Sequence, residues 1–247
     1  MKKILFACDL DNTLIHSHRH KLKNDICIEI FNEKQQSFIT PRTDYFLKEL
    51  YKSNNITLLP VTTRSIEQYS RINWHKDYTP EYSLVTNGSI TLKNNIPVYL
   101  ENTEGYYSEV ESLYKKIIDT SDFLKVKIVD GMYLFAYCEE NSDVRYYAEK
   151  YSELTNLTTQ YSGRKIYFFP PFANKGLAVK KFAEKYRYNY IISAGDSIID
   201  YPMLENADMA IVPDSETASV LKNPNIKICS NTVFSEFILE TILNHRF

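Results

Sequence analysis

Hydrophobic residues along the chain form short continuous runs, and these alternate with apolar stripes at helical spacing. Continuous runs of about five apolar residues are typical of strands buried on both faces of a parallel sheet. Stripes at helical spacing predict amphipathic helices between the runs. The predicted core strands are residues 4–8, 56–61, 82–86, 190–194, 209–212 and 226–229. This alternation predicts an α/β fold with a doubly wound parallel sheet.

Helix starts are marked by residues that can cap a first turn. Thr40 followed by Pro41 predicts a helix start, because a threonine cap and a proline in the first position suit a first turn. Asn174 is expected to cap the helix that ends near residue 186, and Ser142 to cap a helix at 144–154. These caps place the helix boundaries between the predicted strands.

Between residues 88 and 171 the pattern changes, and hairpins replace single buried strands. Asp130-Gly131, for example, separates two short apolar runs, which is typical of a hairpin turn. The predicted order is a hairpin at 90–100, a helix at 106–117, a hairpin at 126–137, a helix at 144–154 and a hairpin at 158–169. We expect an inserted antiparallel α+β domain at 88–171, within a core formed by residues 1–87 and 172–247.

Composition and charge narrow the functional classes. The 247 residues include 29 Lys and Arg against 31 Asp and Glu, a net charge of −2, which argues against a nucleic-acid partner. The four cysteines include no C-x-x-C pair, which indicates a reduced, cytoplasmic protein. The first apolar run ends at Asp9, too early for a signal peptide, and no run approaches the ~20 residues of a membrane span. We therefore expect no membrane partner, and the sequence does not indicate an oligomeric state.

Reactive side chains follow several of the apolar runs. Because the carboxyl ends of parallel strands form the ligand sites of such sheets, we expect these side chains to converge. Clustered carboxylates repel one another, and Mg²⁺ is a hard cation that prefers oxygen ligands. Beside a lysine and threonine hydroxyls, the cluster predicts a site for a phosphoryl group. The residues are Asp9-Leu10-Asp11-Asn12-Thr13, Thr62-Thr63-Arg64, Lys175 and Gly195-Asp196 with Asp200.

The six glycines exclude two other phosphate-binding patterns. None is spaced as in a G-x-G-x-x-G fingerprint, and none opens a P-loop. The dinucleotide-binding and P-loop interpretations therefore fail.

The motifs resemble those of the haloacid dehalogenase-like (HAD) hydrolases, and specifically the Cof-type, class IIB capped phosphatases. Residues 9–13 are similar to the family's D-x-D-x-T, and Thr62 to its second motif. Asn87-Gly88 resembles the N-G before the cap, 175–178 the K-G-x-A motif, and 195–204 the G-D-x-x-N-D-x-x-M-L motif. Two positions depart from the family: Thr63 replaces a glycine, and Ile199 replaces an asparagine.

The resemblance implies a Rossmann-like core, with residues 88–171 as the cap, and a Mg²⁺-dependent phosphatase. Such an enzyme would hydrolyse a small phosphorylated metabolite, for example a sugar phosphate, through an aspartyl-phosphate. The implied roles are Asp9 as nucleophile, Asp11 as general acid and base, and Thr62, Lys175, Asn12 and Arg64 as phosphate ligands, Thr62 and Lys175 being catalytic as well. The implied Mg²⁺ ligands are Asp9, Asp11 through its backbone carbonyl, Asp196 and Asp200, the last of which could instead orient Lys175.

Two other functions stay open. A phosphomutase would return the phosphoryl group from the same aspartyl-phosphate to a sugar. A regulatory protein would bind a phosphorylated metabolite with little turnover, which the loss of the asparagine at Ile199 makes conceivable. Product analysis separates the first from a phosphatase, and ligand-induced melting shifts without phosphate release identify the second.

Some residues also allow more than one interpretation. Thr63 could take the role of Thr62, and Arg64 could form a salt bridge rather than contact phosphate. The stretch 16–40, with a hairpin turn at 32–36, is expected to be a flap over the site. This stretch contains three histidines, His16, His18 and His20. They would share one face of a strand as a transition-metal site, or lie in a polar loop. The candidates for substrate contact in the insert are Tyr133, Tyr137 and Tyr167.

Overall fold

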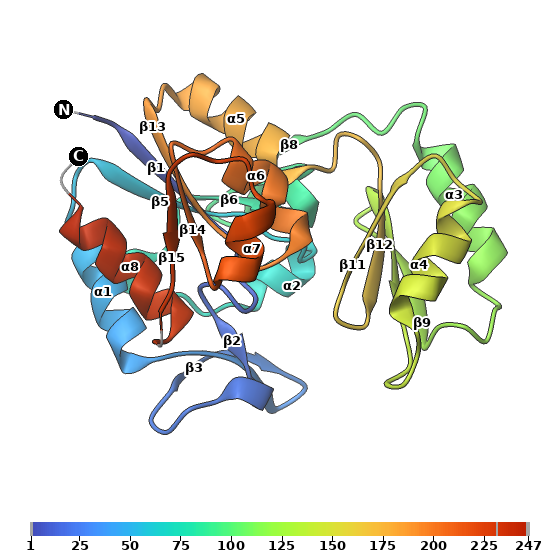
Figure 1. Ribbon diagram of the computed structural model, residues 1–247, viewed down its shortest axis with the longest axis horizontal. Helices are drawn as coiled ribbons and strands as arrows, with labels where there is room; N and C mark the ends of the chain where they lie inside the picture. The colour runs from blue at the N-terminus through green and yellow to red at the C-terminus, as the bar shows by residue number, and fades with distance from the viewer. Residues whose placement is uncertain (1, 231, 246–247) are drawn as a thin grey trace.

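The computed structural model describes residues 2–230 and 232–245, and Figure 1 shows two parts side by side. The larger part surrounds a five-stranded parallel sheet. Its strands, in spatial order, are β15 (Ile226–Ile228), β14 (Met209–Val212), β13 (Tyr190–Ala194), β1 (Ile4–Cys8) and β5 (Ile56–Pro60). All four neighbouring pairs are parallel, which confirms the predicted α/β fold.

Alternate residues of β1 face two different helical layers. Ile4, Phe6 and Cys8 share a core cluster with α1 (Pro41–Tyr51) and α8 (Phe234–Asn244), which pack against each other. Leu5 and Ala7 pack instead with α5 (Lys175–Tyr186) and α6 (Tyr201–Glu205). Because both faces are covered, β1 is apolar throughout rather than alternating.

The predicted flap is a three-stranded antiparallel sheet, β2-β4-β3. It contains β2 (His16–Ser17), β3 (Ile26–Phe31), β4 (Lys34–Ile39) and the short 3-10 helix η1 (His18–His20). Asn32 and Glu33, both with positive φ, form a tighter turn than the predicted one at 32–36. Because the chain turns into η1 after Ser17, the three histidines do not share one strand face.

A second three-stranded sheet connects the parts. It pairs β6 (Tyr82–Val85), β7 (Ile90–Lys93) and β8 (Ile96–Leu100), and η3 (Thr86–Gly88) joins the first two strands. Residues 82–86 were predicted as a strand of the parallel sheet, but β6 pairs antiparallel with β7, and a parallel bridge from Leu84 to Val61 attaches it beside β5. The expected domain boundary at residue 88 lies inside this sheet, and it stays a prediction. Between β5 and β6 lie α2 (Ile66–Ser70) and η2 (Lys76–Tyr78).

The smaller part follows the predicted order of helices and hairpins. Its antiparallel sheet, β11-β12-β10-β9, lies toward the larger part, and both helices cover the opposite face (Figure 1). The helix α4 is capped by Asp143, whose side chain accepts from the Tyr146 N–H, so the prediction of Ser142 as the cap was wrong. The elements are α3 (Tyr107–Ile117), β9 (Lys125–Val129), β10 (Tyr133–Tyr137), α4 (Val144–Ser152), β11 (Thr158–Ser162) and β12 (Lys165–Phe169).

The remaining elements lie in the C-terminal half of the larger part. They are the 3-10 helix η4 (Ile198–Asp200) after β13, and α7 (Ser215–Val220) between β14 and β15. None of the helices in the described residues is long and apolar enough to span a bilayer.

Candidate active site

Four predicted site residues meet where β1 and β13 end. Asp9 directly follows β1, and its N–H donates to the Ala194 carbonyl of β13 over 2.9 Å. Asp196 follows β13, and Asp200 ends η4. Lys175 begins α5, where Asn174 caps the first turn by accepting from the Leu177 N–H. The carboxyl ends of the sheet therefore bring together groups that are up to 191 positions apart in the sequence.

Lys175 forms a buried ion pair with two of these carboxylates. Its Nζ lies 2.5 Å from Asp9 Oδ1 and 2.5 Å from Asp200 Oδ1, and its side chain is only 2% exposed. Burial alone lowers the pKa of Lys175, but the negative charges of Asp200 and Asp9 outweigh it and raise the pKa. The ammonium group therefore stays charged beside the proposed nucleophile.

Asp200 is fixed from the opposite side by the turn that follows β13. Its Oδ2 accepts from the Asp196 N–H at 3.2 Å, the Ser197 N–H at 3.0 Å and the Ser197 hydroxyl at 2.9 Å. A Cβ at Gly195 would lie 2.5 Å from the Asp200 Cβ, closer than packed atoms allow. The glycine is therefore required for this close approach.

The carboxylates fit a divalent cation. Oxygens of Asp9, Asp196 and Asp200 lie within 4.8 Å of one another, the one such group in the part of the chain that the structure describes. Burial, Asp200 and Asp196 raise the pKa of Asp9 despite Lys175, and burial with Asp200 raises the pKa of Asp196 to about 6. One ammonium group does not balance three carboxylates. A hard, oxygen-binding divalent cation would restore the balance.

Asp11 lies outside this group and is held by Arg64. Arg64 Nε donates to Asp11 Oδ2 and Nη2 to Oδ1, both at 2.8 Å, a bidentate pair. Burial raises the pKa of Asp11, but the charge and hydrogen bonds of Arg64 outweigh it and lower the pKa. In this conformation Asp11 is ionised, whereas a general acid must carry a proton.

Arg64 is in turn held by the flap. Its Nη1 donates to Glu29 Oε2 at 2.9 Å, and its Nη2 donates to the Ser37 hydroxyl at 3.1 Å. Of the two alternatives for Arg64, the structure shows the salt bridge. Glu29 was missed in the sequence analysis, although a single carboxylate inside the apolar strand β3 signals a buried charge that needs a partner.

The other expected phosphate ligands lie in the same loops but already have partners. Thr62 is 1% exposed, and its hydroxyl accepts from the Arg64 N–H at 3.1 Å. The Asn12 N–H donates to the Ile15 carbonyl at 2.8 Å, with Asn12 at φ 64°. Thr63 is not among the residues with positive φ, so its backbone does not require the glycine of the family motif.

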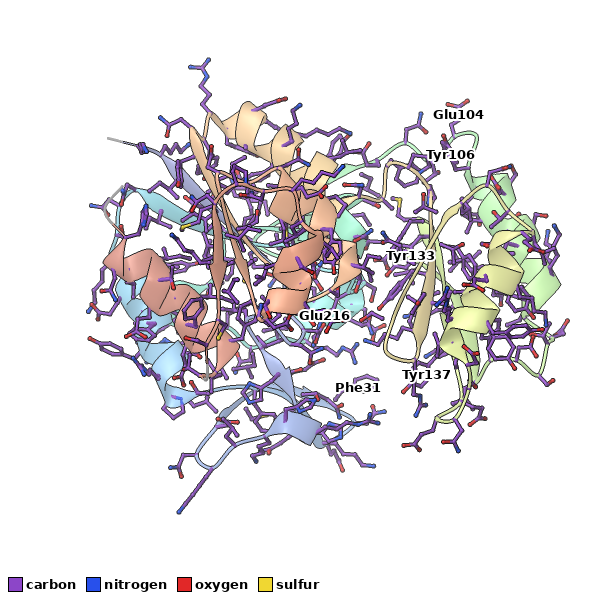
Figure 2. All side chains as sticks on the ribbon, viewed as in Figure 1. Phe31, Glu104, Tyr106, Tyr133, Tyr137 and Glu216 are labelled. Atoms are coloured by element: carbon purple, nitrogen blue, oxygen red, sulfur yellow. The ribbon has the colours of Figure 1, made fainter. Side chains whose placement is uncertain are left out.

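The remaining candidates are the histidines of the flap and the tyrosines of the insert. His16 Nε2 lies 2.6 Å from Asp25 Oδ2, and no histidine of the described chain belongs to a candidate metal group. Tyr133 lies between the two parts (Figure 2), and its hydroxyl donates to the Thr63 carbonyl at 2.6 Å. Tyr167 is also buried there, whereas Tyr137 is half-buried. Asp130, expected only in a hairpin turn, accepts hydrogen bonds from Ile66 and Thr86 of the larger part.

Ile199 is buried among apolar side chains of the main core cluster, at 4% exposure. An asparagine there would need a hydrogen-bond partner to offset its burial. The isoleucine therefore contributes packing at the position where the family motif carries a polar group.

Comparisons with known proteins identify the family and the fold. No curated protein matches the sequence. The solved structures that resemble the chain include the sucrose-phosphatase from Synechocystis sp. PCC6803, in complex with sucrose and phosphate, with a TM-score of 0.69, 17% identity and 98% of both chains covered. They also include trehalose-6-phosphate phosphatase from Aspergillus fumigatus, with a TM-score of 0.55, 14% identity and 99% and 94% covered.

A haloacid dehalogenase-like hydrolase from B. subtilis has a TM-score of 0.64 at 13% identity, with 99% of both chains covered. At these identities the similar structures establish the fold alone. The sequence itself matches the family model for haloacid dehalogenase-like hydrolases over residues 72–232, more than half of the chain. The resemblance expected from the motifs is thereby confirmed: the chain belongs to the haloacid dehalogenase-like hydrolases and is an enzyme of that family.

Proposed function

We propose that the protein is a Mg²⁺-dependent phosphatase that hydrolyses a small phosphorylated metabolite through an aspartyl-phosphate on Asp9. The observation that carries this proposal is the buried Lys175 between Asp9 and Asp200, next to Asp196. A sugar phosphate is the proposed substrate class, because similar structures are named as a sucrose-phosphatase and a trehalose-6-phosphate phosphatase.

The proposed reaction uses Asp9 twice, first as nucleophile and then as leaving group. A carboxylate oxygen of Asp9 forms a bond to phosphorus while the bond to the leaving oxygen breaks. Water then attacks the phosphorus of the aspartyl-phosphate, which releases phosphate and restores the Asp9 carboxylate. Lys175 and Thr62 hold phosphoryl oxygens during both steps, with Asn12 as a further ligand.

Mg²⁺ would be held by Asp9, Asp196, Asp200 and the backbone carbonyl of Asp11. When bound, it supplies positive charge that stabilises the negative charge on the phosphoryl oxygens. Asp200 also keeps Lys175 in place through their ion pair.

Asp11 is the proposed acid and base. It protonates the leaving oxygen in the first step and takes a proton from the attacking water in the second. The ion pair with Arg64 suits the second role, since an ionised carboxylate can accept a proton. For the first role Arg64 must release the carboxylate, and a phosphate group competes for the same guanidinium.

The smaller part would act as a cap over this site. In the proposed division, residues 88–171 form the cap and residues 1–87 and 172–247 form the core. The strand β11 lies against η4, which carries Asp200, and Tyr133 bonds to the backbone beside Thr62. A cap in this position would select the leaving group and exclude bulk water.

The test is release of inorganic phosphate from a panel of phosphorylated metabolites, with Mg²⁺ and with a chelator. We expect release that needs Mg²⁺ and falls by about 10³-fold or more in Asp9→Asn, because the nucleophile is lost. The matched control is Asp119→Asn, an exposed aspartate of the smaller part, which should keep full activity.

Three results would contradict the proposal. Release that persists in Asp9→Asn would exclude Asp9 as the nucleophile. Transfer of the phosphoryl group to a sugar, shown by product analysis, would identify a phosphomutase. A melting shift with a ligand, but no release from any substrate, would identify a binding protein.

A further inference from the structure

We call the sheet β11-β12-β10-β9 the cap sheet. One of its two faces is directed toward the catalytic core. Side chains of a strand alternate between its two faces. Leu134 and Ala136 of β10 pack in the cap's own cluster with α3 and α4. Tyr133 belongs to the cluster of the core, and Phe135 packs against it. The odd-numbered residues of β10 therefore mark the face toward the active site.

Strand register places three lysines on this face. Lys127 of β9 pairs with Phe135, and its Nζ lies 5.8 Å from the centre of that ring. Tyr137 pairs with Lys125 on one side and with Lys165 of β12 on the other. The core-facing side of the cap sheet therefore combines positive charge with aromatic rings.

Among the described residues, no ion pair holds these lysines. Lys125, Lys127 and Lys165 form no ion pair with any described residue. On the helical side of the cap, by contrast, Lys150 pairs with a carboxylate at 2.6 Å. Burial and the charge of Lys125 lower the pKa of the half-buried Lys127. Asp130 and Glu67 act against this shift from beyond ion-pair distance, so Lys127 can still take an anionic partner.

Of the three lysines, Lys165 is the one that interacts electrostatically with residues of the proposed active site. It begins β12, the partner of β11, which lies against η4. Its pKa is raised by Tyr167 and, against the effect of burial, by Asp11 and Asp9. Lys165 is thus on the cap side of Asp11, the proposed acid for the leaving group. The phosphoryl group that is transferred already has Lys175 as its cation, so Lys165 is available to another anion.

We propose that the cap sheet selects a substrate whose leaving group carries a second anionic group, a phosphate or a carboxylate, with Lys165 as its main ligand and Lys127 as a second. The ring of Tyr137, between Lys125 and Lys165, carries the Arg164 guanidinium over its face, 4.5 Å from the ring centre, which adds a further positive charge to this end of the sheet. This inference rests on the proposed phosphatase function and adds the substrate class.

The test compares substrates that differ by one anionic group. Glucose 6-phosphate, with one anionic group, is the reference; glucose 1,6-bisphosphate adds a phosphate, and 6-phosphogluconate adds a carboxylate. With Mg²⁺, we expect kcat/KM of the wild type to be about tenfold or more higher for at least one substrate with two anionic groups. Lys165→Gln should remove most of that preference, measured as the ratio of kcat/KM for the substrate with two anionic groups to kcat/KM for glucose 6-phosphate. Lys115→Gln, in the outer helix α3, is the matched control and should keep the preference.

A measurement of sugar binding to the Asp9→Asn variant distinguishes a failure of this inference from a failure of the proposed function. Calorimetry with this variant should show tighter binding of the sugars with two anionic groups than of glucose 6-phosphate, and Lys165→Gln in the same background should abolish the difference. That result without phosphate release from any substrate would support the anion site and reject the phosphatase. Phosphate release with no preference for a second charge, or a preference that survives Lys165→Gln, would overturn the anion site and leave the phosphatase standing.

Discussion

Arg64 uses one guanidinium group to join three segments of the chain. It binds Asp11 after β1, Glu29 of β3 and Ser37 of β4, so the flap is tied to the proposed acid. A guanidinium offers five donors in one plane, which a lysine cannot reproduce. Any substrate that recruits Arg64 must therefore also disturb the contact between flap and core.

The carboxylate of Asp44 should make the stability of the fold depend on pH. Its Oδ2 accepts from Lys48 and its Oδ1 from the Tyr78 hydroxyl, both at 2.7 Å. Burial raises the pKa of Asp44, but these bonds outweigh it and lower the pKa. Because the pKa of Asp44 is lower in the folded chain than in the unfolded chain, its ionised form stabilises the fold at pH values above the unfolded pKa of about 3.9. This stabilisation is lost as the pH falls through the folded pKa.

We therefore expect Asp44→Asn to lower the free energy of unfolding by about 1 kcal/mol at neutral pH. The difference from the wild type should shrink below about pH 4, where the wild-type carboxylate is protonated as well. Urea unfolding at several pH values measures this, with Asp119→Asn as the exposed control. A difference that stays constant into acid would show that the charge of Asp44 does not contribute.

At the scale of elements, the start of α5 depends on close packing against α6. A Cβ added at Gly176 would overlap the backbone carbonyl of Pro202. The two helices can approach this closely only with a glycine there, and Lys175 is the adjacent residue. The packing of α5 on α6 thus sets the position of the buried ammonium group.

Gly176→Ala should therefore be destabilising, although the same change in an exposed helix stabilises by about 1 kcal/mol. We expect a loss of about 1–3 kcal/mol from overpacking, and a lower kcat because Lys175 shifts with the helix. Chemical denaturation and phosphate release measure the two effects. Leu177→Ala, at a half-exposed neighbouring position, should change stability by less than about 0.5 kcal/mol. A Gly176→Ala variant as stable as the wild type would contradict the close approach.

At the scale of the whole molecule, the turn between β9 and β10 connects the smaller part, which is the proposed cap, to the larger part. Asp130 Oδ2 accepts from the Thr86 hydroxyl at 2.6 Å and from the Ile66 N–H at 2.9 Å. The Tyr133 hydroxyl binds the carbonyl of Thr63 in the same region. These bonds reach segments that directly follow β5 and β6, so the position of the cap is coupled to the loops of the site.

Asp130→Gly should loosen this connection while keeping the turn, because glycine tolerates the positive φ of 48° at this position. We expect the Ile66 amide to exchange its hydrogen about tenfold faster, since it loses its acceptor, and KM to rise. Hydrogen exchange by NMR and steady-state kinetics are the measurements. Asn95→Gly, in the turn between β7 and β8, is the matched control. Unchanged exchange at Ile66 would show that Asp130 does not hold the cap.

The sequence by itself determined the five strands of the parallel sheet, although it also assigned residues 82–86 to that sheet, where the structure has an antiparallel strand. It determined as well the helix starts at Thr40 and Asn174, and the carboxylates and lysine that meet at the strand ends. Burial periodicity and capping are local properties, and the carboxyl end of a parallel strand fixes where its next residues lie. Only the tertiary structure decided the partners of Arg64, the contacts of Asp130 and the core-facing lysines of the cap sheet. Arg64 and Asp11 are 53 positions apart, and Lys175 and Asp9 are 166 apart. Such contacts depend on how separate elements pack, which no local pattern specifies.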